Sequence, residues 1–287
     1  MIKNIIFDIG NVLVNFNWKA FTEDLGYTKE INERIFNATV RSKEWAECDR
    51  GVLTDEEILD AFIKNDPGIE TELRRMFENF NGLLIQFPYS KGFIKDLQNH
   101  GFKVYALSNM SYKATRECAD AMDFLPMLDG YVLSCDIKVV KPEERIYANI
   151  CEKYSLNPSE CVFLDDVSEN VEAAQKFGMK AIQFKDLKSA VKELEGIVKE
   201  SGDKAFKSVY SKKQRIGAIV CLSIIGLLYL LTFVLSLINA PWATKMLKVS
   251  LGSTLVLPIL AWIYIWMIGK LTHRETIADF NFFKDYE

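Results

Sequence analysis

The chain has 287 residues, of which 49% are hydrophobic and 26% charged, a composition typical of globular proteins rather than disordered ones. Its charge is unevenly distributed, since residues 1–202 hold 25 basic and 34 acidic residues, whereas residues 203–287 hold ten basic and five acidic ones. An acidic body disfavours nucleic-acid binding, which usually requires a basic face. The six cysteines form no CxxC pair, which indicates reduced thiols in a cytosolic body.

Residues 1–202 alternate between short apolar stretches and helical patterns. The predicted strands are 2–7, 102–107, 131–134, 161–164 and 180–184. The predicted helices are 91–100, 112–122, 143–154 and 169–177, two of which end at Gly101 and Gly178. Because short apolar strands joined by helices form a parallel sheet, this order predicts an α/β fold with a Rossmann-like parallel sheet.

One stretch interrupts the alternation. Residues 16–88 show helical patterns without a clear strand, and Thr54 and Glu57 have the spacing of a capping box that opens a helix. The stretch is therefore predicted as an all-helical insertion between the first strand and the rest of the sheet. This leaves 1–15 and 89–202 to form the core.

Polar side chains occur where predicted strands end or a helix is about to begin. They supply carboxylates for a hard cation, a hydroxyl and an amide for phosphate oxygens, and one fixed cation: Asp8, Ser108, Asn109, Lys141, Asp165 and Asp166. In an open α/β sheet, ligands bind beyond the carboxyl ends of the strands. Mg²⁺ prefers oxygen ligands, and a carboxylate can attack phosphorus. Each residue alone also fits a turn, a helix cap or a solvated surface, but together they predict a magnesium and phosphate site.

The end of the chain carries two uncharged runs, 216–238 and 249–269. At about 1.5 Å per residue, each is long enough to cross a hydrocarbon core of about 30 Å. They predict a two-span helical hairpin in the lipid bilayer, with a pair of buried core helices as the alternative. Basic residues concentrate in the linker 203–215, so the positive-inside rule places the body and the tail 270–287 at the cytoplasmic face of the plasma membrane.

Four short motifs resemble those of a known family. FDIGNVL at 7–13, LSN at 107–109, VKP at 140–142 and FLDD at 163–166 resemble the four ordered motifs of the haloacid dehalogenase superfamily of phosphatases. The stretch 16–88 is similar to the helical cap of the first subgroup. The resemblance is greatest to α-D-glucose-1-phosphate phosphatase-like members and more distant to the phosphatase-like domain of soluble epoxide hydrolase. It covers roughly residues 1–200 and none of the tail.

The resemblance implies a nucleophile and a metal site. Asp8 corresponds to the nucleophile and is also a Mg²⁺ ligand, and the backbone carbonyl of Gly10 is a second ligand. Asp166 corresponds to the ligand of the fourth motif, with Asp165 as its close neighbour. Mg²⁺ is therefore the implied cofactor.

The resemblance also implies how phosphate is held. Ser108 and the Asn109 amide bind the phosphate, and Lys141 neutralises its charge. The implied reaction is hydrolysis of a small phosphorylated metabolite, with a sugar phosphate as one example, through a phospho-aspartate intermediate. A dehalogenase on the same fold needs the aspartate but no metal, and the Asp165–Asp166 pair favours the phosphatase over this alternative.

One position departs from the family pattern. The family usually has an aspartate two residues after the nucleophile as general acid and base, a function worth about 10²–10⁴ in rate. Gly10 stands there and has no proton to give. Three interpretations of this glycine remain. A good leaving group can make the acid dispensable, or another side chain can take its place. In the third, the domain is a catalytically weak, membrane-anchored phosphate-binding or regulatory module. In the predicted cap, Trp45, Glu47, Asp49 and Arg50 are candidate substrate contacts, with a core role for Trp45 and solvated charges as the alternative.

Overall fold

The computed structural model describes residues 1–201 and residue 230. The chain divides into two compact units, Met1–Phe206 and Lys207–Glu287. In the part of the chain that is described, no helix is both long enough and apolar enough to cross a membrane. Four predicted segments lie outside the described residues, apart from Leu230: 203–215, 216–238, 249–269 and 270–287.

A five-stranded, all-parallel sheet lies at the centre of the first unit, in the spatial order β5-β4-β1-β6-β7. The predicted parallel α/β sheet is therefore confirmed. β1 lies in the middle, paired with β4 on one side and β6 on the other, and all four of its residues are buried. The strands lie within two residues of their predicted bounds: β1 Asn4–Phe7, β4 Lys103–Ser108, β5 Gly130–Leu133, β6 Cys161–Asp165 and β7 Lys180–Gln183.

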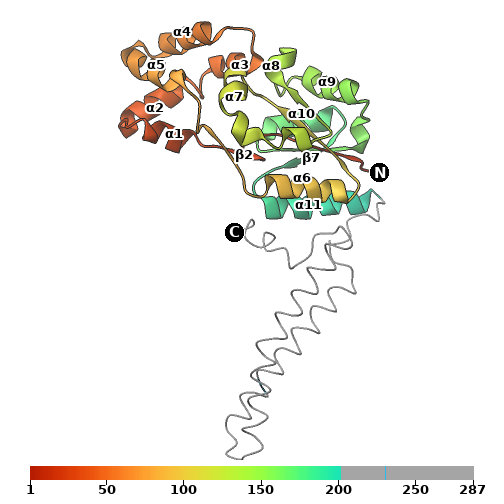
Figure 1. Ribbon diagram of the computed structural model, residues 1–287. Helices are drawn as coiled ribbons and strands as arrows, with labels where there is room; N and C mark the ends of the chain where they lie inside the picture. Colours follow the sequence, from red (N-terminus) through yellow and green to blue (C-terminus); the bar gives the residue numbers. More distant parts are fainter. Residues whose placement is uncertain (202–229, 231–287) are drawn as a thin grey trace, which may run out of the picture. The chain divides into compact units, whose positions relative to one another are not determined.

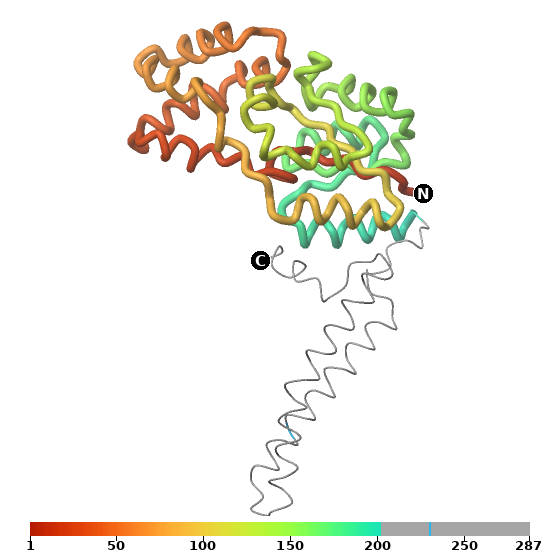
Figure 2. Tube along the Cα trace, in the orientation of Figure 1, coloured from red at the N-terminus to blue at the C-terminus, as the bar shows by residue number. Residues whose placement is uncertain are grey.

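Helices cover both faces of the sheet. Successive side chains of a strand point to opposite faces, and in β1 both faces carry buried apolar side chains. Ile5 and Phe7 of β1 belong to an apolar cluster that includes side chains of α6 and α11, whereas Ile6 packs with α9 and α10. Figure 1 and Figure 2 show α6 and α11 side by side beneath the sheet. The four helices are α6 Ser90–Asn99, α9 Glu144–Tyr154, α10 Ser168–Lys176 and α11 Leu187–Glu200.

One predicted helix differs from the structure, and the long helix α11 was not predicted. The predicted helix 112–122 breaks at Cys118 into α7 (Tyr112–Glu117) and a 3₁₀ turn (Ala119–Met122). Cys118 has a φ of −110°, outside the helical range, and its thiol donates to the Phe80 carbonyl at 3.0 Å. The helix α11 was not predicted, although its apolar face packs on the sheet. The contact between Cys118 and Phe80 thus accompanies the end of α7, which comes earlier than the sequence pattern indicates.

Five α-helices lie between β1 and α6 in the chain. The predicted capping box is confirmed, since the Thr54 hydroxyl accepts from the Glu57 N–H and the Glu57 carboxylate accepts from the Thr54 N–H. We call the five helices between β1 and α6 the cap: α1 Trp18–Asp24, α2 Lys29–Ala38, α3 Lys43–Arg50, α4 Asp55–Asn65 and α5 Glu70–Glu78. Figure 1 shows α1, α2, α4 and α5 grouped at one end of the unit, with α3 next to α8 (Ser134–Ile137).

The prediction that this insertion is all-helical is wrong. The strands β2 (Val14–Phe16) and β3 (Leu84–Gln86) pair antiparallel, one before the cap helices and one after them. A strand of three residues is too short to show a period of two in the sequence. The pairing joins the two ends of the insertion where they leave and re-enter the core.

Candidate active site

Three carboxylates meet at the carboxyl edge of the sheet. Asp8 directly follows β1, Asp165 is the last residue of the neighbouring β6, and Asp166 comes next. One oxygen from each side chain lies within 4.8 Å of the other two. Because β1 and β6 are adjacent and parallel, their ends bring these side chains together, as the sequence predicts. Oxygen donors of this kind suit Mg²⁺.

Lys141 supplies a positive charge to this cluster. Its side chain is 1% exposed, and Nζ lies 2.7 Å from Asp8 Oδ1 and 2.7 Å from Asp165 Oδ2. Burial favours the neutral amine, but the two carboxylates outweigh it and raise the pKa of Lys141 above its usual value. The ammonium is therefore charged at neutral pH and offsets one of the two carboxylates that it contacts.

Asp8 is a carboxylate with little water around it. Burial raises its pKa to about 6, and the charge of Asp165 adds to this, while Lys141 and the Ser108 hydroxyl act in the opposite direction. The N–H of Ile9 donates to Asp8 Oδ1 at 2.7 Å. At neutral pH the group is ionised, oriented and poorly hydrated, which suits a nucleophile.

Asp165 and Asp166 differ in what their oxygens already bind. Asp165 is fully buried and accepts from Lys141, from Asn170 Nδ2 at 3.0 Å and from the Val167 N–H at 2.9 Å. Asp166 is half-buried and accepts from Asn11 Nδ2 at 2.9 Å. Asp165 therefore orients Lys141, whereas Asp166 keeps more capacity to bind a cation.

The end of β4 contributes a hydroxyl and a carboxamide. Ser108 is 1% exposed and forms a hydrogen bond with Asp8. The Asn109 carboxamide binds the backbone of Lys141 in both directions, donating to its carbonyl at 3.1 Å and accepting from its N–H at 2.7 Å. These two bonds fix the loop that carries Lys141 to β4. The six residues predicted from strand ends and the neighbouring loop thus lie at one edge of the sheet.

The family follows from comparison with known proteins. Residues 2–178 match the model of the haloacid dehalogenase-like hydrolases. The chain belongs to this family. It is 28% identical over 213 residues to mouse acyl-CoA dehydrogenase family member 10, covering 68% of this chain and 19% of that protein, so it spans about a fifth of that relative. Phosphatase MT3486 of Mycobacterium tuberculosis is 26% identical over 63% of this chain and 86% of its own length.

The fold of this hydrolase also occurs in HAD family enzyme bt-2542 of Bacteroides thetaiotaomicron. A mutant of that enzyme was solved in complex with magnesium and inorganic phosphate. The alignment covers 67% of this chain and 99% of that one, with 20% identity and a TM-score of 0.52. At this identity the likeness shows a common fold.

The hydrolase has open space at Gly10, two residues after Asp8. A Cβ placed on Gly10 would have no atom within 4 Å. The next side chain is already engaged, since Asn11 donates to Asp166 and accepts from the Phe16 N–H at 3.1 Å. The glycine therefore leaves room that a substrate or another side chain can occupy.

The four cap residues named from the sequence have different surroundings. Trp45 stacks on Phe62, with ring centroids 6.1 Å apart, and belongs to the aromatic core of the cap. Glu47 and Arg50 pair with each other at 3.2 Å. Asp49 differs from the other three because the charges of Asp8 and Lys141, at the carboxyl edge of the sheet, act on its pKa.

Asp49 is coupled electrostatically to the site. Burial raises its pKa to about 7, and the negative charge of Asp8 adds to this. Lys141 and a hydrogen bond from the Ser111 N–H act in the opposite direction. The cap therefore contributes a carboxyl group that changes protonation close to neutral pH.

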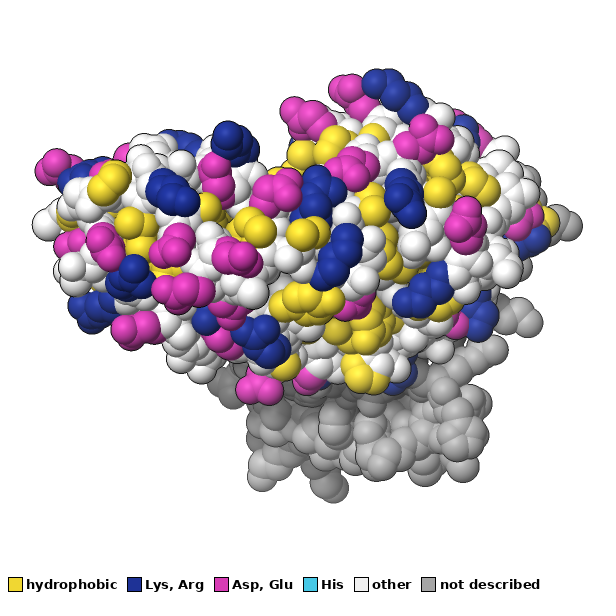
Figure 3. Space-filling model, turned by 90° about the horizontal axis from the view of Figure 1, so that it is seen from above, with side chains coloured by type: hydrophobic (Ala, Val, Ile, Leu, Met, Phe, Trp, Pro, Cys, Tyr) yellow, Lys and Arg dark blue, Asp and Glu magenta, His cyan; other side chains and the backbone are white. Residues whose placement is uncertain are grey.

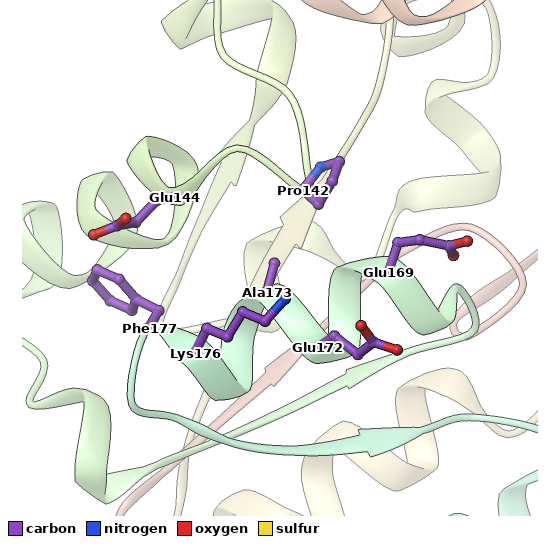
Figure 4. Close-up of a pocket in the computed structure, with 7 residues that line it drawn as sticks. All are labelled: Pro142, Glu144, Glu169, Glu172, Ala173, Lys176 and Phe177. Atoms are coloured by element: carbon purple, nitrogen blue, oxygen red, sulfur yellow. The ribbon is translucent and has the colours of Figure 1, made fainter.

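A cavity of about 390 Å³ lies between α9 and α10, and none of these groups lines it. Figure 4 shows three glutamates and one lysine around it, with none of the predicted site residues. The lining residues are Pro142, Glu144, Glu169, Glu172, Ala173, Lys176 and Phe177. The cavity is therefore distinct from the carboxylate site.

Proposed function

We propose that this hydrolase is a Mg²⁺-dependent phosphatase that cleaves a small phosphorylated metabolite through a phospho-Asp8 intermediate. The observation that carries the proposal is the buried contact of Lys141 with both Asp8 and Asp165, beside the third carboxylate of Asp166. A nucleophile, a fixed cation and a set of oxygen donors are thus present at one edge of the sheet. The phosphatase relative from Mycobacterium tuberculosis supports the same activity.

Each residue at the edge has a distinct part in the proposed reaction. The Asp8 carboxylate attacks phosphorus and displaces the alcohol, and a water molecule then hydrolyses the aspartyl-phosphate. Lys141 holds Asp8 in place and offsets charge on the phosphoryl oxygens. Ser108 and the main-chain amide of Asn109 bind those oxygens, since the Asn109 carboxamide is already bonded to the backbone of Lys141.

The donor set fits a magnesium ion. Asp8, Asp166 and the carbonyl of Gly10 would hold it, with Asp165 as the neighbouring carboxylate. All of these donors are oxygens, and Mg²⁺ is usually bound by one or two carboxylates together with a substrate phosphate. When bound, the ion would withdraw charge from the phosphoryl group. The magnesium and phosphate bound by the mutant of bt-2542 support this assignment.

The substrate we favour is a sugar phosphate esterified at the anomeric oxygen, as in the α-D-glucose-1-phosphate phosphatase-like members. The support for this choice is Gly10, which offers no acid to protonate the leaving group. An anomeric hydroxyl is more acidic than an ordinary alcohol, so it departs with less need of a proton.

The test is hydrolysis of an aryl phosphate by the full chain with added Mg²⁺. Asp8→Asn should abolish turnover, and chelation of Mg²⁺ should do the same for the parent chain. Asp120→Asn, an exposed change of the same chemistry, is the control. A phosphoryl group should be trapped on the peptide that contains Asp8. Equal turnover by Asp8→Asn and the parent chain would reject the mechanism.

The glycine at position 10 also favours a second candidate, a module that binds phosphate without turning it over. The two functions separate on one panel of phosphorylated metabolites. Binding of a phosphate analogue with no release of phosphate across the panel would support the module. Halide release from a 2-haloacid without metal would instead support the dehalogenase.

We further propose that the segments 216–238 and 249–269 anchor the phosphatase at the cytoplasmic face of the plasma membrane. The support is the absence of charge from both runs, since a central charge costs about 2.5–3.5 kcal/mol on insertion scales. In a background without native cysteines, a cysteine at Thr244 should react with an impermeant reagent from outside intact cells. A cysteine at Ser211 should not, and the opposite pattern would invert the topology.

A further inference from the structure

The proposed reaction leaves one chemical requirement unmet. When Asp8 attacks phosphorus, even an anomeric oxygen departs faster if it gains a proton, and the water that attacks the phosphoenzyme must lose one. Gly10 has no side chain to do this. We propose that Asp49, supplied by the cap, is the general acid and base of the reaction, an inference that rests on the proposed phosphatase function.

The polar groups at the sheet edge are already committed to other roles. Asp165 is bonded to Lys141 and Asn170, and Asp166 accepts from Asn11 beside the proposed metal position. Lys141 contacts two carboxylates that stabilise its charged form, so it does not readily give up a proton. We therefore assign the proton transfer to a group outside this edge, and no side chain at position 10 fills the space where a Cβ would meet no atom within 4 Å.

Several contacts hold the end of α3 against the core. The Ser134 hydroxyl at the start of α8 (Ser134–Ile137) donates to the Asp49 carbonyl at 2.6 Å. The Ser111 N–H hydrogen-bonds the Asp49 carboxylate. Gly51 has a φ of +68°, and a Cβ there would lie 2.8 Å from Cys135 Cβ. The backbone around Asp49 therefore lies directly on α8.

Charged groups strengthen the same contact. Arg50 donates to the Glu143 carboxylate at 2.7 Å and to the Lys138 carbonyl at 3.4 Å. The Lys138 ammonium in turn donates to the carbonyl of Gly51. These bonds join the cap to two core segments on either side of Lys141. The Ser134 hydroxyl that donates to the Asp49 carbonyl also accepts from the Met110 N–H at 2.9 Å, which ties Asp49 to the end of β4 beside Ser108 and Asn109.

The protonation of Asp49 suits both halves of the reaction. With a pKa raised to about 7 by burial and by Asp8, the group is present as acid and as base near neutral pH. The titratable groups that face it are Asp8, Lys141 and two thiols. Burial raises the pKa of Cys48 to about 12 and of Cys135 to about 11, so both thiols stay neutral there.

The reaction has two chemical steps. An Asp8 oxygen forms a bond to phosphorus, the bond from phosphorus to the ester oxygen breaks, and that oxygen takes the proton of the Asp49 carboxylic acid. The Asp49 carboxylate then removes a proton from water as the water oxygen attacks phosphorus. The bond between phosphorus and Asp8 breaks, inorganic phosphate leaves, and both side chains return to their starting forms.

The test compares two esters of similar size on the purified full chain, benzyl phosphate and 4-nitrophenyl phosphate. The ester oxygen of benzyl phosphate must gain a proton as its bond to phosphorus breaks, whereas 4-nitrophenolate leaves as a stable anion. Asp49→Asn should slow single-turnover cleavage of benzyl phosphate by about 10²–10⁴ and that of 4-nitrophenyl phosphate by less than about threefold. Asp60→Asn, an exposed change in the cap, should affect neither ester.

The second half of the reaction gives a separate signature. Because Asp49→Asn also removes the base, it should release a rapid burst of one nitrophenolate per enzyme, followed by slow turnover. In the parent chain, single-turnover cleavage of benzyl phosphate should fall above a pH of about 7 as Asp49 loses its proton. This fall of the rate above a pH of about 7 should be absent from Asp49→Asn. Asp49→Glu should cleave benzyl phosphate faster than Asp49→Asn and more slowly than the parent chain.

The outcomes separate the inference from the function on which it rests. Equal slowing of both esters by Asp49→Asn, or slowing of neither, would overturn the role of Asp49 while the activity of the parent chain upheld the phosphatase. If the parent chain and Asp8→Asn alike cleaved neither ester, the phosphatase itself would be rejected and the inference with it. A melting temperature of Asp49→Asn equal to that of Asp60→Asn would show that the folded state is intact.

Discussion

The carboxyl edge of the sheet and the outer surface of the cap both carry many charges, but water reaches them to very different extents. At the edge, the side chains of Lys141 and Asp165 are 1% and 0% exposed and lie 2.7 Å apart. On the cap, Arg74 contacts three carboxylates while its own side chain is 44% exposed. Figure 3 shows both signs of charge side by side over the surface.

The difference matters because water and salt screen exposed charges and hardly screen buried ones. A buried charge is costly unless it is paired, so the three-dimensional position of each partner at the edge is fixed. Exposed pairs on the cap impose no such requirement. The edge therefore holds a fixed arrangement of reactive groups, and the cap is fixed mainly by apolar packing and by its contact with α8.

The largest effect should come from Lys141→Met. This change removes the partner of two buried carboxylates, and breaking a buried pair typically destabilises by about 3–5 kcal/mol. Urea unfolding without metal should show the loss, and phosphatase activity should fall by at least about 10². Lys91→Met removes an exposed pair with Asp123 and serves as the control. Equal stability of the two variants would contradict the proposed contrast between edge and surface.

Most of the core was predictable because its signals are local. The strands β1 and β6 are apolar runs bounded by polar residues, and each is followed directly by an aspartate. The parallel topology then brings those aspartates together without any further information. The strands β2 and β3 were not predictable in this way, because three residues carry no periodicity and their pairing joins positions about 70 residues apart.

The support of the site was harder to predict than the site itself. Asn170 lies one turn into α10 and looks like any exposed helix residue, yet its carboxamide holds Asp165. Asp49 could be named only as one of four cap residues near Gly51. Its position over the core depends on contacts with Ser134 and Ser111, and nothing in the sequence relates those segments to α3.

The next largest effect should come from Gly51→Ala, which disturbs the contact between cap and core. The residue has a φ of +68°, and the added Cβ would lie 2.8 Å from Cys135 Cβ. We expect a loss of about 1–3 kcal/mol, together with slower cleavage of benzyl phosphate. Gly82→Ala is a matched control, because its φ of +88° imposes similar strain while no atom lies within 4 Å of the new Cβ. Equal losses would show that strain, and not the contact with α8, determines the result.

A smaller effect is expected at the start of α4. Thr54→Ala removes the hydroxyl that accepts from the Glu57 N–H and donates to the Glu57 carboxylate, and it should cost about 1 kcal/mol of stability, measured by thermal or urea unfolding. Thr28→Ala is the comparison, because Thr28 caps α2 through a single bond to the Ile31 N–H at 3.3 Å. The loss at Thr54 should be the greater of the two. The reverse order would show that the bond from the Thr54 hydroxyl to the Glu57 carboxylate adds nothing.

The smallest effect should come from Arg74→Ala on the surface of the cap. Although the guanidinium contacts Glu56, Asp60 and Glu70, these groups are exposed and their attraction is screened by water. The change in melting temperature should be smaller than that of Thr54→Ala at low salt and should vanish in 1 M salt, where the screening length falls to about 3 Å. The effect of Lys141→Met should persist at the same salt concentration, because its carboxylate partners are buried. If both effects vanished together, the edge charges would be as hydrated as those of the cap, and the distinction between the two regions would fail.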